Sequence, residues 1–165
     1  MNSRAYGQAL EDALQLRHTF YNRDRQALVW HNGTQSIHKR DEVIQVASLP
    51  DYTGLLNKCS GRLVCFDAKH LNDEQLIYRH SSKQPHQLIH LWDVYCNSGI
   101  AFLLVSYRML KHWVVWPDKS WANGGPFRIC LRDGEYTSWE ATECPSDENG
   151  LPDWLTVMDA QVQEA

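Results

Sequence analysis

The chain has 165 residues, 43% of them apolar, which is enough for the core of one domain, and its formal net charge is −4. No stretch approaches the ~20 consecutive apolar residues of a membrane span, and the polar N-terminus lacks the apolar run of a secretory signal. Five cysteines without Cys-x-x-Cys spacing favour reduced thiols in a cytoplasm over a disulfide framework or a zinc knuckle.

The charges are divided unevenly along the chain. All 16 Lys and Arg lie in residues 1–134 together with 12 Asp and Glu, so that part carries +4. Residues 135–165 hold 8 acidic residues and no Lys or Arg, so they carry −8. We therefore expect a single domain over 1–134 and an acidic C-terminal extension over 135–165 that packs on it or trails from it. The mildly basic body permits nucleic acid as a partner without requiring it.

The first half of the chain shows four patterns of regular structure. They predict a helix over 3–22 and strands over 27–31, 51–56 and 61–69. The helix follows from apolar residues at helical spacing, such as Leu10 and Leu14. Residues 32–50 are polar, and we expect them to project from the body.

The second half of the chain shows further patterns of regular structure. The patterns predict a polar loop over 70–83, a helix over 84–97, strands over 100–107 and 112–116, a segment rich in Gly, Pro and Trp over 118–150, and a helix over 151–164. The continuous apolar run 100–107 is typical of a strand at the centre of a sheet. The order of helix, strands, helix and strands predicts one mixed α/β domain.

Two charged residues interrupt the apolar strand 61–69. Asp67 and Lys69 are two residues apart, so their side chains leave the same face, ~6.6 Å apart along the strand. Asp51 begins the neighbouring strand and can lie across from them in an antiparallel pair. Glu11 projects from the first helix, which such a sheet needs as a cover.

Three carboxylates and a lysine suit metal-dependent hydrolysis of a phosphodiester. Carboxylate oxygens hold Mg²⁺, which polarises the phosphoryl group, and a lysine can orient water or stabilise the charge that grows at phosphorus. The spacing alone is weak evidence, because Asp-x-Lys on a strand often occurs by chance, and a surface ion-pair cluster is the alternative interpretation.

The amino-acid sequences of three segments are more specific evidence of function than the spacing of Asp67 and Lys69. The stretches "PDYTGLLNKCSGRLVCFDAKH", "PHQLIHLWDVYCNSGIAFLLVSY" and "GQALED" resemble the RecU-type Holliday junction resolvases of the PD-(D/E)xK nuclease superfamily. The resemblance runs from about residue 7 to 116. It implies a restriction-endonuclease-like α/β fold, with a mixed central sheet flanked by helices.

The resemblance also implies an activity and a set of site residues. It implies a homodimeric endonuclease that depends on Mg²⁺, or on Mn²⁺ in its place, and cuts four-way DNA junctions by paired symmetric nicks. Glu11, Asp51 and Asp67 match the metal ligands, and Lys69 matches the residue that positions or activates water. Gln87 matches a group that contacts the DNA backbone or a water on the metal, although a solvated residue at a helix start is the simpler interpretation.

The chain departs from the family pattern in several places. Asp67 stands where many relatives have Glu, and residues 32–48 are shorter than the family's projecting stalk. The basic N-terminal arm is absent, and the Trp-rich stretch and acidic tail have no counterpart. These departures are typical of a compact version of the family in a bacterial cytoplasm. A phage origin is compatible with them, and they leave open whether the protein contacts a host recombinase.

Six further residues are candidate phosphate contacts, although such clusters are often only a solvated surface. They are Lys39, Arg40, Lys58, Arg62, Lys83 and His86. A zinc site at His86 and His90 is disfavoured, because Gln87 stands where zinc proteases have a general base. Two alternatives to a junction resolvase stay open: another PD-(D/E)xK nuclease acting on branched or flapped DNA, and a junction-binding protein without catalysis.

Overall fold

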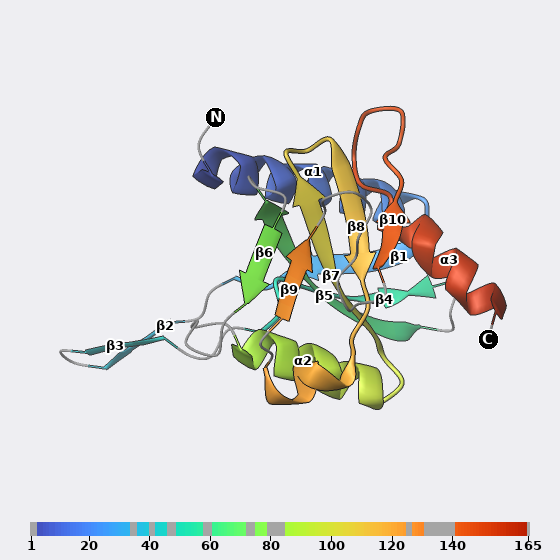
Figure 1. The fold of residues 1–165 in the computed structure, drawn as a ribbon. Coiled ribbons are helices and arrows are strands. Elements are labelled where there is room, and N and C mark those ends of the chain that lie inside the picture. Colours follow the sequence, from blue (N-terminus) through green and yellow to red (C-terminus); the bar gives the residue numbers. More distant parts are fainter. Residues whose placement is uncertain are drawn as a thin grey trace.

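The computed structural model shows an α/β architecture built around a central sheet (Figure 1). The residues it describes are 3–33, 36–39, 42–45, 49–57, 61–71, 75–78, 85–124, 127–130 and 141–164. The elements in chain order are α1 (Ser3–Arg23), β1 (Ala27–His31), β2 (Ser36–Lys39), β3 (Glu42–Gln45), β4 (Tyr52–Leu56), β5 (Arg62–Leu71), β6 (Gln75–Tyr78), α2 (Pro85–Cys96), β7 (Ile100–Tyr107), β8 (Lys111–Val115), the 3₁₀ helix η2 (Lys119–Asn123), β9 (Phe127–Cys130), β10 (Ala141–Cys144) and α3 (Trp154–Glu164).

The central sheet has six strands in the order β1-β4-β5-β7-β8-β10. Strands β5 and β7 are parallel and joined through α2, whereas the other neighbouring pairs are antiparallel. The predicted mixed sheet flanked by helices is therefore confirmed. The apolar run 100–107 forms β7, which is buried from Ile100 to Ser106 near the middle of the sheet, as its pattern indicated.

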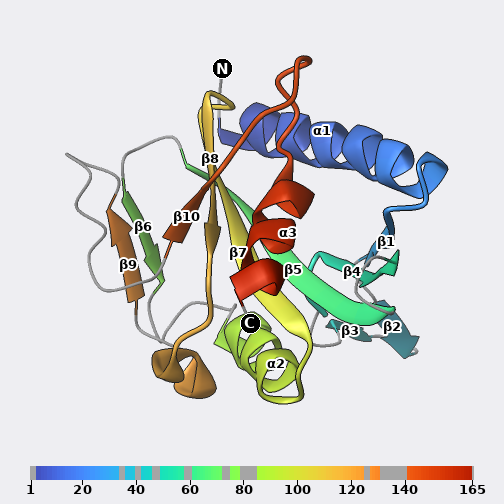
Figure 2. The same cartoon turned by 90° about the vertical axis from the view of Figure 1, so that its right-hand side faces the viewer.

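Helices cover both faces of the sheet (Figures 1 and 2). On one face, Leu10 and Leu14 of α1 and Trp154 of α3 pack into a single cluster with Phe66 and Phe102. On the other face, Leu88 and Leu91 of α2 and Trp121 of η2 pack with alternate residues of β5 and β7. Because successive strand residues point to opposite faces, the even and odd residues of β5 belong to different layers.

Two predictions for the polar segments had different outcomes. Residues 36–39 and 42–45 form the antiparallel hairpin strands β2 and β3, which lie outside the central sheet and project from the body as expected (Figure 1). The loop predicted over 70–83 was wrong in part, because β5 continues to Leu71 and residues 75–78 form β6, paired with β9. Pairing with β7 and stacking of His70 on Tyr6 extend β5 beyond its apolar run.

Three tryptophans of the second half of the chain, whose rings could otherwise stack on unpaired bases, lie in the interior. Trp113 and Trp116 are 7% exposed and Trp121 is fully buried, so they pack in the domain rather than offering a free stacking surface. Trp139 lies outside the described residues. In the described part of the chain, no helix is both long enough and apolar enough to cross a membrane.

The acidic extension contributes to the same core. Strand β10 pairs with β8, and the side chain of Trp154 in α3 is fully buried. Arg17 of α1 donates to Asp147 (3.0 Å) and forms an ion pair with Asp153 (2.5 Å). The Tyr21 hydroxyl also donates to Asp153 (2.6 Å). Two acidic groups of the extension are therefore bound by side chains of the first helix.

Arg17→Met is expected to lower the free energy of unfolding by about 2–3 kcal/mol, because it leaves two largely buried carboxylates without their partner. The matched control is Arg23→Met, which breaks only the exposed pair with Asp24 and is expected to cause no measurable loss. Urea unfolding of the three proteins measures both changes. Equal stability of Arg17→Met and the parent would contradict the proposed link between helix and extension.

Two buried histidines make the fold sensitive to acid. Burial lowers the pKa of His18 to about 3 and that of His112 to about 4, from 6.5 in an unfolded chain. His18 Nε2 also accepts a hydrogen bond from the Trp154 indole (3.2 Å), which requires the neutral ring. Between pH 6.5 and about 4 the unfolded chain binds protons that the folded one does not, so stability falls as the pH falls.

Each histidine is expected to remove about 1.4 kcal/mol of stability per pH unit in that window. His18→Gln keeps an acceptor for Trp154 but cannot titrate. Between pH 6.5 and about 4, the free energy of unfolding of this variant should therefore fall by about 1.4 kcal/mol less per pH unit than that of the parent. Urea unfolding at a series of pH values between 4 and 8 tests this. An unchanged slope below pH 6.5 would show that His18 is not the acid-sensitive group.

Candidate active site

The pairing of β4 with β5 places two carboxylates side by side. Tyr52 lies opposite Phe66 in this antiparallel pair, so the residues just before and after them, Asp51 and Asp67, are neighbours. Strand β4 also lies very close to β1, since a Cβ on Gly54 would be 2.4 Å from the Leu28 carbonyl oxygen. The predicted position of Asp51 across from Asp67 is confirmed.

Asp67 and Lys69 lie on the face of the sheet that α2 covers. Cys65 and Leu71, two residues to either side of them, belong to the core cluster beneath α2. Gln87, in the first turn of α2, is only 5% exposed. Helix α2 therefore brings an amide to the charged pair.

Hydrogen bonds tie these four residues into one network. The Asp51 amide donates to Asp67 Oδ1 (3.0 Å), and the Ala68 amide donates to Asp51 Oδ2 (3.1 Å). Gln87 Nε2 donates to Asp67 Oδ1 (3.2 Å), and its Oε1 accepts from Lys69 Nζ (3.4 Å). Lys69 Nζ also forms an ion pair with Asp67 Oδ2 and lies 4.0 Å from Asp51 Oδ2.

The network contains a buried carboxylate, and burial makes its negative charge costly. The Asp67 side chain is fully buried, and this burial raises the pKa of Asp67 to about 7; the charge of Lys69 opposes the rise and that of Asp51 adds to it. Keeping this buried carboxylate ionised therefore opposes folding, and its hydrogen bonds and the Lys69 ammonium offset that cost. The side chains of Asp51 and Lys69 are 33% and 15% exposed, so the site opens to solvent on their side.

Glu11 lies apart from this network. It is exposed on α1, and α1 packs on the face of β5 that carries Phe66, opposite to the face of Asp67. Burial and then the charges of Glu11 and Asp51 raise the pKa of Tyr52, so Glu11 is near the rim of the site. The expected convergence of three carboxylates is not seen, and the ligand role of Glu11 stays a prediction.

The donor set fits a hard divalent cation with few protein ligands. Among the residues described, no three His, Cys, Asp or Glu side chains are close enough together to hold a metal ion. Asp51 and Asp67 nevertheless provide two adjacent carboxylates, and apart from Lys69 the buried Oδ2 of Asp67 has no hydrogen-bond partner in the described structure. Two carboxylates completed by waters and phosphate oxygens are typical of Mg²⁺ sites.

The candidate DNA contacts are distributed unevenly. His86 precedes Gln87 at the start of α2, next to the network. Arg62 begins β5, roughly 23 Å along the strand from Lys69, and its Nε donates to the Ser98 carbonyl oxygen (2.6 Å). The backbone of Lys39 lies in the projecting hairpin. Arg40, Lys58 and Lys83 lie outside the described residues, so all six contacts stay predictions.

One residue beside the site was not singled out from the sequence. Asn32 follows β1 and donates from its backbone and its side chain to the segment that contains Asp51. No local pattern marks it, because an Asn after a strand is a common turn residue. Only the pairing of β1 with β4 brings it to Asp51.

A family model and a related protein both indicate one family. The family model for Recombination protein U, RecU, matches residues 5–121. The chain is similar to the Holliday junction resolvase RecU of Oenococcus oeni, at 27% identity over an alignment of 151 residues that covers 78% of this chain and 75% of that protein. It also matches a solved structure of Hjc, a Holliday junction resolvase of Archaeoglobus fulgidus, with 10% identity, a TM-score of 0.42, and coverage of 73% of this chain and 93% of that one.

Proposed function

The chain belongs to the Recombination protein U (RecU) family, and we propose that it is a Mg²⁺-dependent endonuclease that resolves four-way DNA junctions by paired symmetric nicks. One observation carries the proposal: β4, β5 and α2 assemble Asp51, Asp67, Lys69 and Gln87 into a single network at an open side of the sheet. In a surface ion-pair cluster the carboxylates stay in contact with solvent, whereas the Asp67 side chain is fully buried.

Each residue of the network has its own role in the proposed reaction. Asp51 and Asp67 would hold the divalent ion, which would polarise the scissile phosphate and offset its charge. Lys69 places an ammonium beside the two carboxylates, where it orients water and stabilises the charge that develops at phosphorus. Gln87 bridges Asp67 and Lys69 and thereby fixes the direction of both side chains. We assign to Glu11 a supporting position at the rim.

We infer that recognition rests on the shape of the branch rather than on base edges. The candidate contacts are Lys, Arg and His side chains, which suit phosphate oxygens, and phosphate contacts position a protein on DNA without reading its sequence. The projecting hairpin β2–β3 is a suitable element to enter the open centre of a junction (Figure 1). The protein then acts on DNA in the cytoplasm.

A homodimer matches this task, because a two-fold axis supplies two like centres for two symmetric nicks. A strip of apolar residues supports an interface on the face that carries Asp67: Leu28, Leu55 and Leu63 are register neighbours on β1, β4 and β5, with Trp30 beside them. These four side chains are 37–45% exposed. Exposed apolar patches of this kind mark interaction surfaces.

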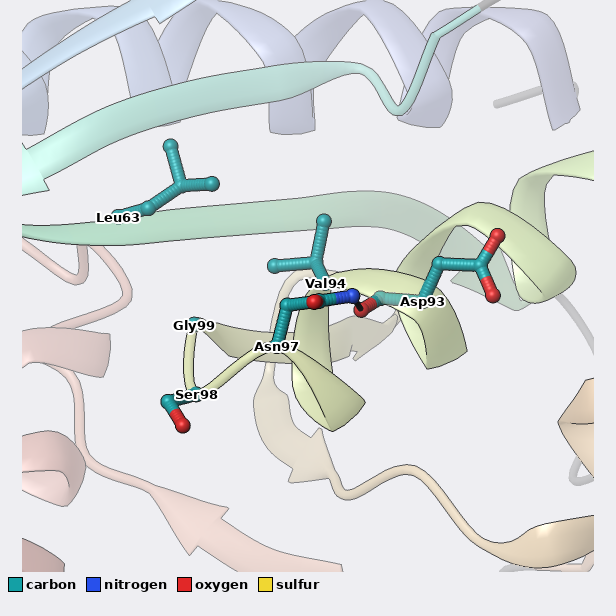
Figure 3. Close-up of a pocket in the computed structure, with 6 residues that line it drawn as sticks. All are labelled: Leu63, Asp93, Val94, Asn97, Ser98 and Gly99. Carbon is teal, nitrogen blue, oxygen red and sulfur yellow. Dashed lines mark hydrogen bonds between the residues drawn. The ribbon is translucent and has the colours of Figure 1, made fainter.

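The strip ends at a cavity of about 300 Å³ beside Leu63, at the C-terminal end of α2 (Figure 3). Val94 points from α2 toward β5, and Asp93, Asn97 and Ser98 form a polar rim. The cavity suits an apolar side chain of the partner copy.

Leu55→Lys is expected to give a monomer in sedimentation velocity, whereas the parent is expected to be a dimer. A dimer of unchanged affinity would exclude this strip as the interface.

The function is tested with the purified full chain and three labelled DNAs: a four-way junction, a flap and a linear duplex, each with Mg²⁺ and with chelator. We expect paired nicks in the junction that require the metal, and little cutting of the duplex. Faster cutting of the flap would favour another nuclease for branched DNA. Tight junction binding with no cutting in any metal would favour a junction-binding protein.

A further inference from the structure

We propose that Asn32 is a positioning residue that holds Asp51 in the orientation needed for metal binding and cleavage. This inference rests on the proposed function, since Asn32 acts only through Asp51. Asn32 is not in the catalytic network itself. It contacts the backbone of Pro50 and Asp51 and the side chain of Thr53.

Asn32 binds the segment around Asp51 at three points. Its backbone amide donates to the Asp51 carbonyl oxygen (2.7 Å). Its side-chain Nδ2 donates to the carbonyl oxygen of Pro50 (2.7 Å) and to Thr53 Oγ1 (2.6 Å). The two peptide groups that flank the Asp51 Cα are thus both fixed to one asparagine.

These bonds act together with those on the other side of Asp51. The Asp51 amide donates to Asp67 Oδ1, and Asp51 Oδ2 accepts from the Ala68 amide. Thr53 also accepts from the Cys65 thiol (3.7 Å), which extends the contact to β5. Asn32 therefore holds the backbone on either side of the Asp51 Cα, while β5 holds the Asp51 carboxylate, and loss of the Nδ2 bonds releases the backbone at Pro50.

The position of Asn32 in the chain adds to this role. The excursion that carries the hairpin β2–β3 leaves the sheet after β1 at Asn32 and returns at Pro50. Because Asn32 Nδ2 bonds to the Pro50 carbonyl, it closes the base of that excursion directly beside Asp51. A longer or looser base would allow the carboxylate to shift, and a shift of ~1 Å can reduce a reaction rate by 10²-fold.

The chain contains a matched control at the opposite end of the same strand pair. Asn57 follows β4, its amide donates to the Gln26 carbonyl oxygen (3.0 Å), and its Nδ2 donates to that of Arg25 (3.0 Å). Asn57 therefore clamps β1 to β4 in the same manner as Asn32. It does so away from Asp51, so it has no role in cleavage.

The experiment compares Asn32→Ala, Asn32→Asp and Asn57→Ala with the parent. Asn32→Asp keeps the size of the side chain but cannot donate to Pro50. We expect both Asn32 variants to lower the single-turnover cleavage rate of a pre-bound junction by about 10- to 100-fold. Their junction Kd in chelator should stay within about twofold. Asn57→Ala should cut at the parent rate, even where it lowers the melting temperature as much as Asn32→Ala.

A second readout does not depend on cleavage. Mg²⁺ that binds the folded protein raises its melting temperature by mass action, so a displaced Asp51 should reduce that increase in the Asn32 variants but not in Asn57→Ala. Raising Mg²⁺ should recover part of the lost rate. Equal rates and equal Mg²⁺-dependent shifts in the Asn32 and Asn57 variants would overturn the inference.

The outcomes distinguish this inference from the proposed function. If the parent cuts and Asp51→Asn does not, while Asn32→Ala cuts normally, only the role of Asn32 is wrong. If the parent cuts no branched DNA, the proposed function fails, and the Mg²⁺-dependent shift in melting temperature still decides whether Asn32 positions Asp51.

Discussion

Asp67→Asn is expected to abolish cleavage of a four-way junction while leaving junction binding at or above the level of the parent. The amide keeps the shape of the side chain and can still accept from the Asp51 amide, but it removes the buried charge that a divalent ion needs. Binding is preserved because the loss of a carboxylate also relieves its repulsion against the DNA phosphates. Asp51→Asn should behave in the same way.

The measurement is the rate of nicking of a labelled junction under single-turnover conditions, together with a binding titration in chelator. Asp24→Asn is the control, because Asp24 is exposed at the end of α1, where it pairs with Arg23. It should cut and bind as the parent does. A rate within tenfold of the parent in either Asp51→Asn or Asp67→Asn would show that the metal site lies elsewhere.

Lys69→Ala is expected to lower the cleavage rate by roughly 10²–10³, with a much smaller effect on binding. The ammonium forms an ion pair with Asp67, lies 4.0 Å from Asp51 Oδ2 and donates to Gln87 Oε1, so it is held beside both proposed metal ligands. Lys69→Arg should recover little, because a planar guanidinium does not replace a compact ammonium where the Lys69 side chain is only 15% exposed.

A pre-bound junction, with Mg²⁺ added to start the reaction, isolates the chemical step from binding. The comparison of Lys69→Ala with Arg62→Ala is informative, because Arg62 lies at the far end of the same strand. Arg62→Ala should change binding more than rate. If Lys69→Ala cuts at the normal rate but binds weakly, Lys69 is a phosphate anchor and not part of the reaction.

The order of side chains along β5 was predictable because a strand has a period of two. Asp67 and Lys69 had to share a face, and an antiparallel partner had to bring Asp51 opposite to them. The core strand β7 was predictable for a similar reason, since eight consecutive residues without a charge are buried most easily at the centre of a sheet.

The contribution of the helices to the site was not predictable in the same way. Helical spacing identifies the buried face of α1 but not the face of the sheet on which that helix packs. The structure places α1 over Phe66 and α2 over Asp67, so Gln87 enters the network and exposed Glu11 does not. The acidic charge of the extension likewise gave no sign that Trp154 is buried beside Phe66.

The sequence by itself therefore determined the family, the mixed α/β architecture and the pairing of Asp51 with Asp67 and Lys69, because local periodicity and short motifs encode them. Only the tertiary structure decided the orientation of α1, the bridging position of Gln87 and the clamp of Asn32 on Asp51. Each of these depends on contacts between residues far apart in the chain. Such contacts are selected by the packing of whole layers, and no local pattern records them.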